Sequence, residues 1–151
     1  MNDIILYLAT FTACVGYCIH FNVRGRYLYF AAIGGTITFL TYMLCAPLGN
    51  VTARSFIASM VASVYSESLA RVIKVPATTF LIISIIPLVP GGTLYLAMEY
   101  GINNDIMSFM STALSTLGIA GAIALGILLV SSFFRFITSV MNYRKKLKVK
   151  S

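Results

Sequence analysis

The chain has 151 residues, of which 59% are hydrophobic and only 10% are charged, and its mean hydropathy is +0.91. A typical soluble domain carries about 25% charged residues, so this composition excludes a chain that covers its own surface in water. Eleven Lys and Arg residues against four Asp and Glu residues give a net charge of +7. We therefore expect an all-α integral membrane protein, with one transmembrane domain over residues 1–143 and a basic tail over residues 144–151.

The first two apolar segments cover about residues 4–21 and 27–46, and a short basic turn, residues 22–26, separates them. Gly34 and Thr38 lie one helical turn apart in the second segment. Small residues at this spacing let helices approach closely in lipid. The second segment is therefore expected to pack tightly against another helix.

The third apolar segment covers about residues 52–73, and Thr52 is its expected N-cap. Small polar residues follow one another four apart: Ser55, Ser59 and Ser63. This face is expected to pack on other helices and not on lipid. Near the end of the segment, Glu67 and Arg71 are also four apart and can pair. Both a functional role within the membrane and an interfacial ion pair stay open for them.

The fourth apolar segment, residues 76–98, is long enough to cross a bilayer, yet its middle contains Pro87, Pro90, Gly91 and Gly92. Each proline lacks an N–H group and clashes with the preceding helical turn. A backbone break at membrane depth survives only where protein or a water-filled cavity surrounds it. The pattern predicts a discontinuous helix, broken between Pro87 and Gly92, of the kind that transporters use. A simple proline kink is the alternative.

After the break, residues 93–100 are expected to resume as a half-helix whose first N–H groups have no partner within the helix. The helix dipole places partial positive charge at the same end, so a carboxylate or phosphate suits it. The candidate substrate-binding residues are Pro90, Gly91, Gly92 and Thr93, and on weaker grounds Asn22 and Arg26 near the end of the first apolar segment.

No catalytic residues, metal or cofactor are expected. The charge-poor interior offers no acid–base pair and no nucleophile with a base near it. Cys14 and Cys18 share one helix face and His20 stands alone, so we interpret all three as packing or interfacial residues.

The fifth segment is predicted as one helix over residues 106–143, capped by Asn104 or Asp105. At ~1.5 Å per residue it is about 55 Å long, whereas the hydrocarbon core is only ~30 Å thick. One end must therefore protrude or be shielded. Small residues make a second close-packing face here: Gly118, Ala122 and Gly126.

The positions of the basic residues predict the topology. Five crossings with the N-terminus outside place nine of the eleven Lys and Arg residues in the cytoplasm: Arg24, Arg26, Arg71, Lys74, Arg144, Lys145, Lys146, Lys148 and Lys150. This agrees with the excess of Lys and Arg in cytoplasmic loops. Arg54 is the exception on the outer side. We expect the tail to lie near anionic membrane lipids, and nucleic acid is not an expected partner because no folded basic domain accompanies the tail.

The stretch Ile86-Pro87-Leu88-Val89-Pro90-Gly91-Gly92 resembles the Ile-Pro-x-x-Pro-Gly signature of the threonine/serine exporter (ThrE) family. The other matching residues are Phe21-Asn22-Val23 with Arg26, Gly35, Phe56-x-Ala58-Ser59-Met60 and Pro76, while Arg24 stands where the family often has proline. The resemblance covers nearly the whole chain. Its length is similar to that of the small, YjjB-type subunit of the split form, whose partner is a larger, YjjP-type subunit.

The resemblance implies an exporter of small carboxylates in the bacterial inner membrane, acting as a hetero-oligomer with the larger subunit. Relatives are associated with threonine, serine or succinate, and the residues do not choose among these substrates. A different class of function also stays open, namely a non-transporting membrane subunit that stabilises its partner. In that case the break is a packing feature only.

Overall fold

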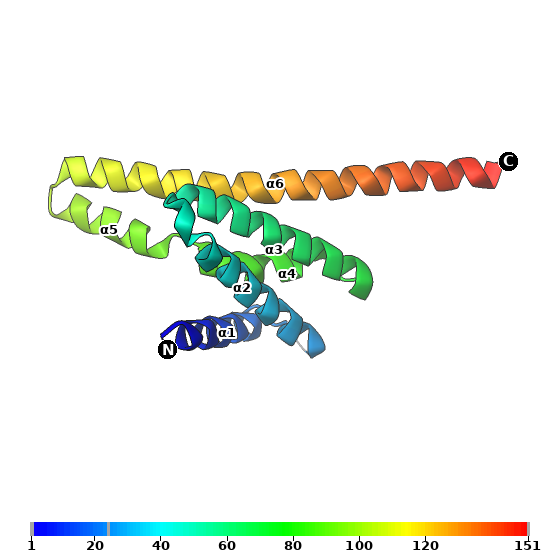
Figure 1. The fold of residues 1–151 in the computed structure, drawn as a ribbon, viewed down its shortest axis with the longest axis horizontal. Helices are drawn as coiled ribbons and strands as arrows, with labels where there is room; N and C mark the ends of the chain where they lie inside the picture. The colour runs from blue at the N-terminus through cyan, green and yellow to red at the C-terminus, as the bar shows by residue number, and fades with distance from the viewer. Residues whose placement is uncertain (1, 24, 151) are drawn as a thin grey trace.

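The computed structural model describes residues 2–23 and 25–150, and every regular element in this part of the chain is helical. The α-helices are α1 (Asn2–His20), α2 (Arg26–Leu44), α3 (Val51–Ile73), α4 (Ala77–Ile85), α5 (Gly91–Ile102) and α6 (Ile106–Lys150), and the 3₁₀ helices are η1 (Ala46–Leu48) and η2 (Ile86–Leu88). Figure 1 shows α6 running the length of the molecule, with α5 along its first part and α3 along its middle. The predicted all-α fold is confirmed.

Three helical stretches are long and apolar enough to cross a membrane by length and composition, namely α2, α3 and residues Ile106–Val140 of α6. The pair formed by Ala77–Leu88 and Gly91–Ile102 is bent by 53° and makes a fourth span if it crosses as one unit. The apolar helix Ile4–His20 is shorter. A polytopic helical membrane protein with one broken span is therefore confirmed, while a count of five crossings stays a prediction.

The ends of α3 and α6 show how local chemistry fixes the helices. The N-cap of α3 is Asn50, whose side chain accepts a hydrogen bond from the Thr52 N–H at 2.9 Å. The prediction of Thr52 as the cap was wrong, because the helix already begins at Val51 after Asn50. Asp105 Oδ1 accepts a hydrogen bond from the Ser108 N–H at 3.1 Å, as predicted for this position. Hydrogen bonds from Ser108 also hold the pKa of the Asp105 carboxyl below its usual value.

The two faces of small residues pack against each other, and the pair of α3 and α6 is the most extensive helix contact in the fold. Ser59 and Gly126 meet so closely that a Cβ atom added to Gly126 would lie 2.9 Å from the Phe56 carbonyl oxygen and closer still to Ser59 Oγ. Further along, Ser63 Oγ lies 3.5 Å from Ser131 Oγ. The prediction that the serine face packs on another helix is confirmed.

Helix α2 is the centre of the bundle, because α1, α3, α4 and η2 all pack against it. Its glycines permit this approach: a Cβ atom at Gly34 would collide with Ser84 and Tyr65, and one at Gly35 would collide with Cys14. Cys14 is buried here together with Cys18, which agrees with their interpretation as packing residues. The close contact between α2 and α4 holds the chain that leads into the break against the bundle.

Helix α6 continues to Lys150 without interruption. The boundary between a transmembrane domain and a tail at residue 143 is therefore not marked by a helix end and stays a prediction. The side chains of the basic tail, residues 144–151, lie outside those that the structure describes.

Candidate functional site

The break lies where the prolines and glycines predicted it. The chain leaves α4, makes the 3₁₀ turn η2 with Pro87 in its first turn, and extends at Val89. Pro90 is the N-cap of α5, which begins at Gly91 and therefore two residues earlier than the predicted half-helix. The direction of the chain changes by 53° across these residues.

The first N–H groups of α5 can be followed one by one. The Gly91 N–H donates to Val89 O at 2.8 Å and the Leu94 N–H donates to Pro90 O at 3.1 Å. Within the described part of the chain, the N–H groups of Gly92 and Thr93 have no backbone acceptor, as expected for the first turn of a helix. The Thr93 hydroxyl donates to Pro90 O at 3.0 Å. Its proton is therefore already in a hydrogen bond, and only its oxygen lone pairs can still accept one.

A pocket of about 210 Å³ opens at this helix end. Its lining residues come from the break and from three neighbouring helices: Tyr42, Val51, Ser55, Ile119 and residues 87–93. A Cβ atom added at Gly91 or Gly92 would meet nothing within 4 Å, so the absence of these side chains leaves the backbone open to approach. Pro90, Gly91, Gly92 and Thr93 all line this pocket, and their role in substrate binding stays a prediction.

Ser55 is the polar side chain that α3 contributes to this pocket. Ser55 is only 1% exposed, and its hydroxyl makes no hydrogen bond with another described residue. This hydroxyl lies on the pocket wall, whereas the fully enclosed side-chain oxygen that lacks a partner among the described residues is Ser84 Oγ on α4, outside the pocket lining. The position of Ser55 on the pocket wall therefore suits a bound polar group that completes its hydrogen bond.

Asn22 and Arg26 do not belong to this pocket. Arg26 is the first residue of α2 and Tyr42 lies near its other end, so about 24 Å of helix separates them. Asn22 lies in the turn after α1 with a left-handed backbone, φ 58°, and the Arg26 guanidinium lies 5.9 Å from the centre of the Tyr27 ring. The predicted site residues thus fall into two groups at opposite ends of α2.

Sequence reasoning gave no role to Arg54, which lies directly beside the pocket wall. Its Nε donates to Tyr42 O at 3.2 Å, and its guanidinium carbon lies 4.2 Å from the centre of the Tyr42 ring. The signal in the sequence that could have identified Arg54 is that the predicted topology places this basic residue on the outer side. The contact with Tyr42 joins α2 and α3, and no single-helix pattern reveals it.

The other charged pair lies elsewhere. Arg71 Nη2 is 3.9 Å from Glu67 Oε2 and donates to Phe134 O of α6 at 3.1 Å. These residues lie near the C-terminal end of α3, whereas the pocket lies at its N-terminal end. The pair therefore fixes the contact between α3 and α6 and lies outside the candidate site.

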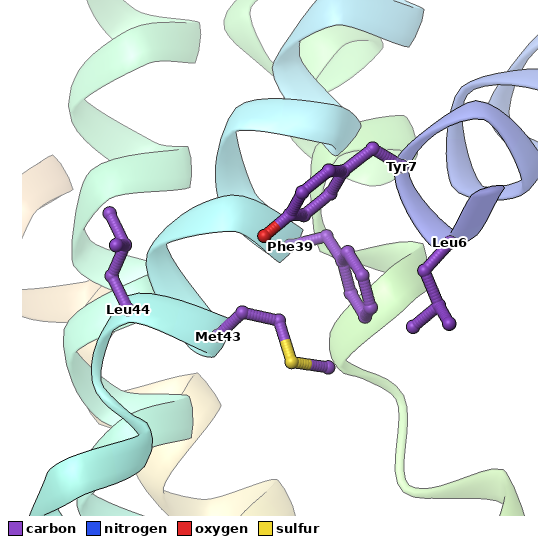
Figure 2. Close-up of a pocket in the computed structure, with 5 residues that line it drawn as sticks. All are labelled: Leu6, Tyr7, Phe39, Met43 and Leu44. Atoms are coloured by element: carbon purple, nitrogen blue, oxygen red, sulfur yellow. The ribbon is translucent and has the colours of Figure 1, made fainter. Parts of the chain in front are cut away.

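Another pocket, of about 250 Å³, lies between α1 and α2. Figure 2 shows Leu6 and Tyr7 from α1 facing Phe39 and Met43 from α2, and the rings of Tyr7 and Phe39 meet edge to face with centroids 6.0 Å apart. Its lining side chains carry no charge and only the Tyr7 hydroxyl as a polar group, so the pocket at the break is the better candidate for an anion. The described residues contain no cluster of His, Cys, Asp and Glu that could hold a metal ion.

A comparison with sequence models of protein families agrees with this architecture. Searches of curated proteins and of solved structures each gave no match. The sequence model of the family described as "Threonine/Serine exporter, ThrE" matches residues 6–133, which include the broken span and the whole pocket lining. The chain therefore belongs to the threonine/serine exporter family and is a membrane transporter and not an enzyme.

Proposed function

We propose that the chain exports small carboxylates, namely threonine, serine or a dicarboxylate of the succinate type, and that the pocket at the break binds the carboxylate group. One observation carries the proposal: the pocket combines two N–H groups without backbone acceptors with the buried hydroxyl of Ser55. Hydrogen bonds to a charged group contribute about 1.5–3 kcal/mol each. Two or three of them can hold a carboxylate without a Lys or Arg among the lining residues.

The proposed exporter works with a larger subunit in a hetero-oligomer. The 35-residue apolar stretch of α6 supports this, because at ~1.5 Å per residue it exceeds the ~30 Å hydrocarbon core. Helix α5 packs mainly against the start of α6. Exposed apolar side chains surround this hairpin, among them Tyr95, Met98, Ile102, Met107 and Leu114. Protein, and not lipid alone, is proposed to cover part of this surface.

In this proposal the chain lies in the bacterial inner membrane, with its N-terminus outside and its C-terminus in the cytoplasm. Asn22 and Arg26 then lie at the cytoplasmic end of α1 and α2. Because about 24 Å of helix separates them from the pocket, they would receive the substrate before it reaches the break.

Glycine substitutions test the site. Gly91→Leu and Gly92→Leu put a side chain into open space in the pocket, so the helix should form while the carboxylate can no longer approach. We expect export of labelled succinate and threonine to fall at least tenfold in cells that also produce the larger subunit. Thr93→Val should reduce export less, because the Thr93 proton is already bonded to Pro90 O.

Gly121→Leu is the matched control, since Gly121 is also an exposed helix glycine with nothing within 4 Å of an added Cβ atom. Purification through a tag on the larger subunit shows whether each variant still assembles. Wild-type export by both pocket variants would remove the break from the mechanism and favour a subunit that only stabilises its partner. Recovery of this chain only as a monomer would contradict the proposed hetero-oligomer.

A further inference from the structure

Arg54 is a positive charge that the fold leaves without an acidic partner. Arg54 is partly buried, and the one ion pair among the described side chains joins Arg71 and Glu67. Of the five N–H donors of a guanidinium, only Nε has a described acceptor, the Tyr42 carbonyl oxygen at 3.2 Å. The Nη donors of Arg54 have no acceptor within the described residues.

This charge lies next to the candidate pocket. Tyr42 lines the pocket and carries the guanidinium over its ring at 4.2 Å, and the residue that follows Arg54 is the pocket residue Ser55. The free N–H groups of α5 belong to Gly92 and Thr93, which line the same pocket. None of the lining residues is an acid, so no lining carboxylate is available for a substrate ammonium group.

A purely structural role explains only part of this arrangement. The Nε hydrogen bond caps one of the last carbonyl groups of α2, and a basic side chain is favourable near the C-terminal end of a helix. That role requires neither the unpaired Nη donors nor a place beside an anion-binding helix end. Ionisable residues in membrane segments are usually paired or functional.

We propose that Arg54 determines substrate specificity by net charge, so that the pocket favours acids with a net negative charge over zwitterions. The inference rests on the proposed function of the pocket. By Coulomb's law with an effective dielectric constant of ~20, a unit charge at a separation of ~10 Å changes affinity by roughly tenfold for each unit of net charge on the ligand. Arg54 therefore favours a dicarboxylate most, a monocarboxylate less, and a zwitterionic amino acid least.

The test measures export of succinate, lactate and threonine by cells that produce the larger subunit together with this chain. The chain is either the wild type or one of three variants: Arg54→Gln, Arg54→Lys or Arg71→Gln. Arg54→Gln should raise the apparent KM for succinate at least tenfold, for lactate less, and for threonine by less than twofold. Arg54→Lys keeps the charge and should keep the order of preference. Arg71→Gln is the matched control, because Arg71 also lies over an aromatic ring, at 5.0 Å from the Phe134 centroid, and donates to a backbone carbonyl.

Equal losses for all three substrates in Arg54→Gln, or the same losses in Arg71→Gln, would reduce Arg54 to a helix cap and overturn the inference. If Arg54→Gln does not reach the membrane, Arg54→Lys decides: a lost order of preference overturns the inference and a kept order supports it. Wild-type protein that exports only the zwitterion would also overturn it. Gly92→Leu is measured in parallel. If this variant still exports substrate, the proposed binding of the carboxylate in the pocket is wrong, whatever the Arg54 variants show.

Discussion

At the scale of single residues, the break depends on backbone effects that are local to the chain, whereas Arg54 and Ser55 depend on contacts between helices. Proline and glycine act on their own backbone, so Pro90 and Gly91 could be assigned to a break from sequence alone. Arg54 depends on Tyr42, twelve positions earlier on another helix. Ser55 was grouped with packing residues because its spacing does not reveal that its hydroxyl reaches a pocket.

Gly126 gives a residue-scale prediction about stability. A methyl group at this position would lie 2.9 Å from the Phe56 carbonyl oxygen, and backbone cannot move away as a flexible side chain can. We expect Gly126→Ala to destabilise the protein by about 1–3 kcal/mol, the range for overpacking. Thermal unfolding of the purified protein in detergent measures this change.

Gly121→Ala is the control for that measurement, since Gly121 lies in the same helix with nothing within 4 Å of an added Cβ atom. It should be neutral or stabilising by up to about 1 kcal/mol, because alanine favours a helix more than glycine does. An equal or higher melting temperature for Gly126→Ala would show that α3 and α6 are not held as closely as the structure has them.

At the scale of the helices, patterns predicted which faces pack but not what they pack against. The sequence predicted that the serine face of α3 and the glycine face of α6 each pack closely on a helix, but it did not predict that they pack on each other. The structure brings them together around Ser59 and Gly126. A periodic pattern shows that a face is suited to close approach, and the partner of that face depends on how all the helices are arranged.

The break permits a prediction at this scale. Pro87 lies in the first turn of η2 and Pro90 is the N-cap of α5, so the double variant Pro87→Ala, Pro90→Ala removes both obstacles to a continuous helix. We expect a straighter span, in which spin labels at Thr78 and Ile102 lie about 4 Å further apart, given a bend of 53° between two 12-residue halves at ~1.5 Å per residue.

Export should fall when the bend is lost, because a continuous helix uses the N–H groups of Gly92 and Thr93 in its own hydrogen bonds. Pulsed electron paramagnetic resonance gives the label distances, and the same variant is assayed for export. A straightened span that exports as well as the wild type would show that the free N–H groups are not needed.

At the scale of the whole molecule, composition and hydropathy predicted a helical membrane protein and the approximate extent of its segments, because lipid demands long apolar helices. The arrangement of the helices was not predictable in the same way. Nothing in the sequence of α2 alone shows that α1, α3, α4 and η2 all pack against it. Its central place follows from contacts at Gly34 and Gly35 that involve other segments.

Whether the broken segment crosses the membrane decides the topology of the chain. A segment that enters and returns on the same side must reverse its direction, whereas α4 and α5 differ by only 53° (Figure 1). With a true crossing and an external N-terminus, we expect the exposed turn at Asn103 and Asn104 outside and the basic C-terminal end of α6 in the cytoplasm, the arrangement that the distribution of Lys and Arg predicts.

Reporter fusions measure this topology directly. A reporter inserted at Asn103 should be active only as an external fusion, and one joined after Ser151 only as a cytoplasmic fusion. A third fusion, in the turn at Gly49, should report the same side as Asn103, because α3 and the broken span together return the chain to that side. A C-terminal fusion that reports the outside would contradict the crossing, because a segment that only enters and returns places the tail on that side.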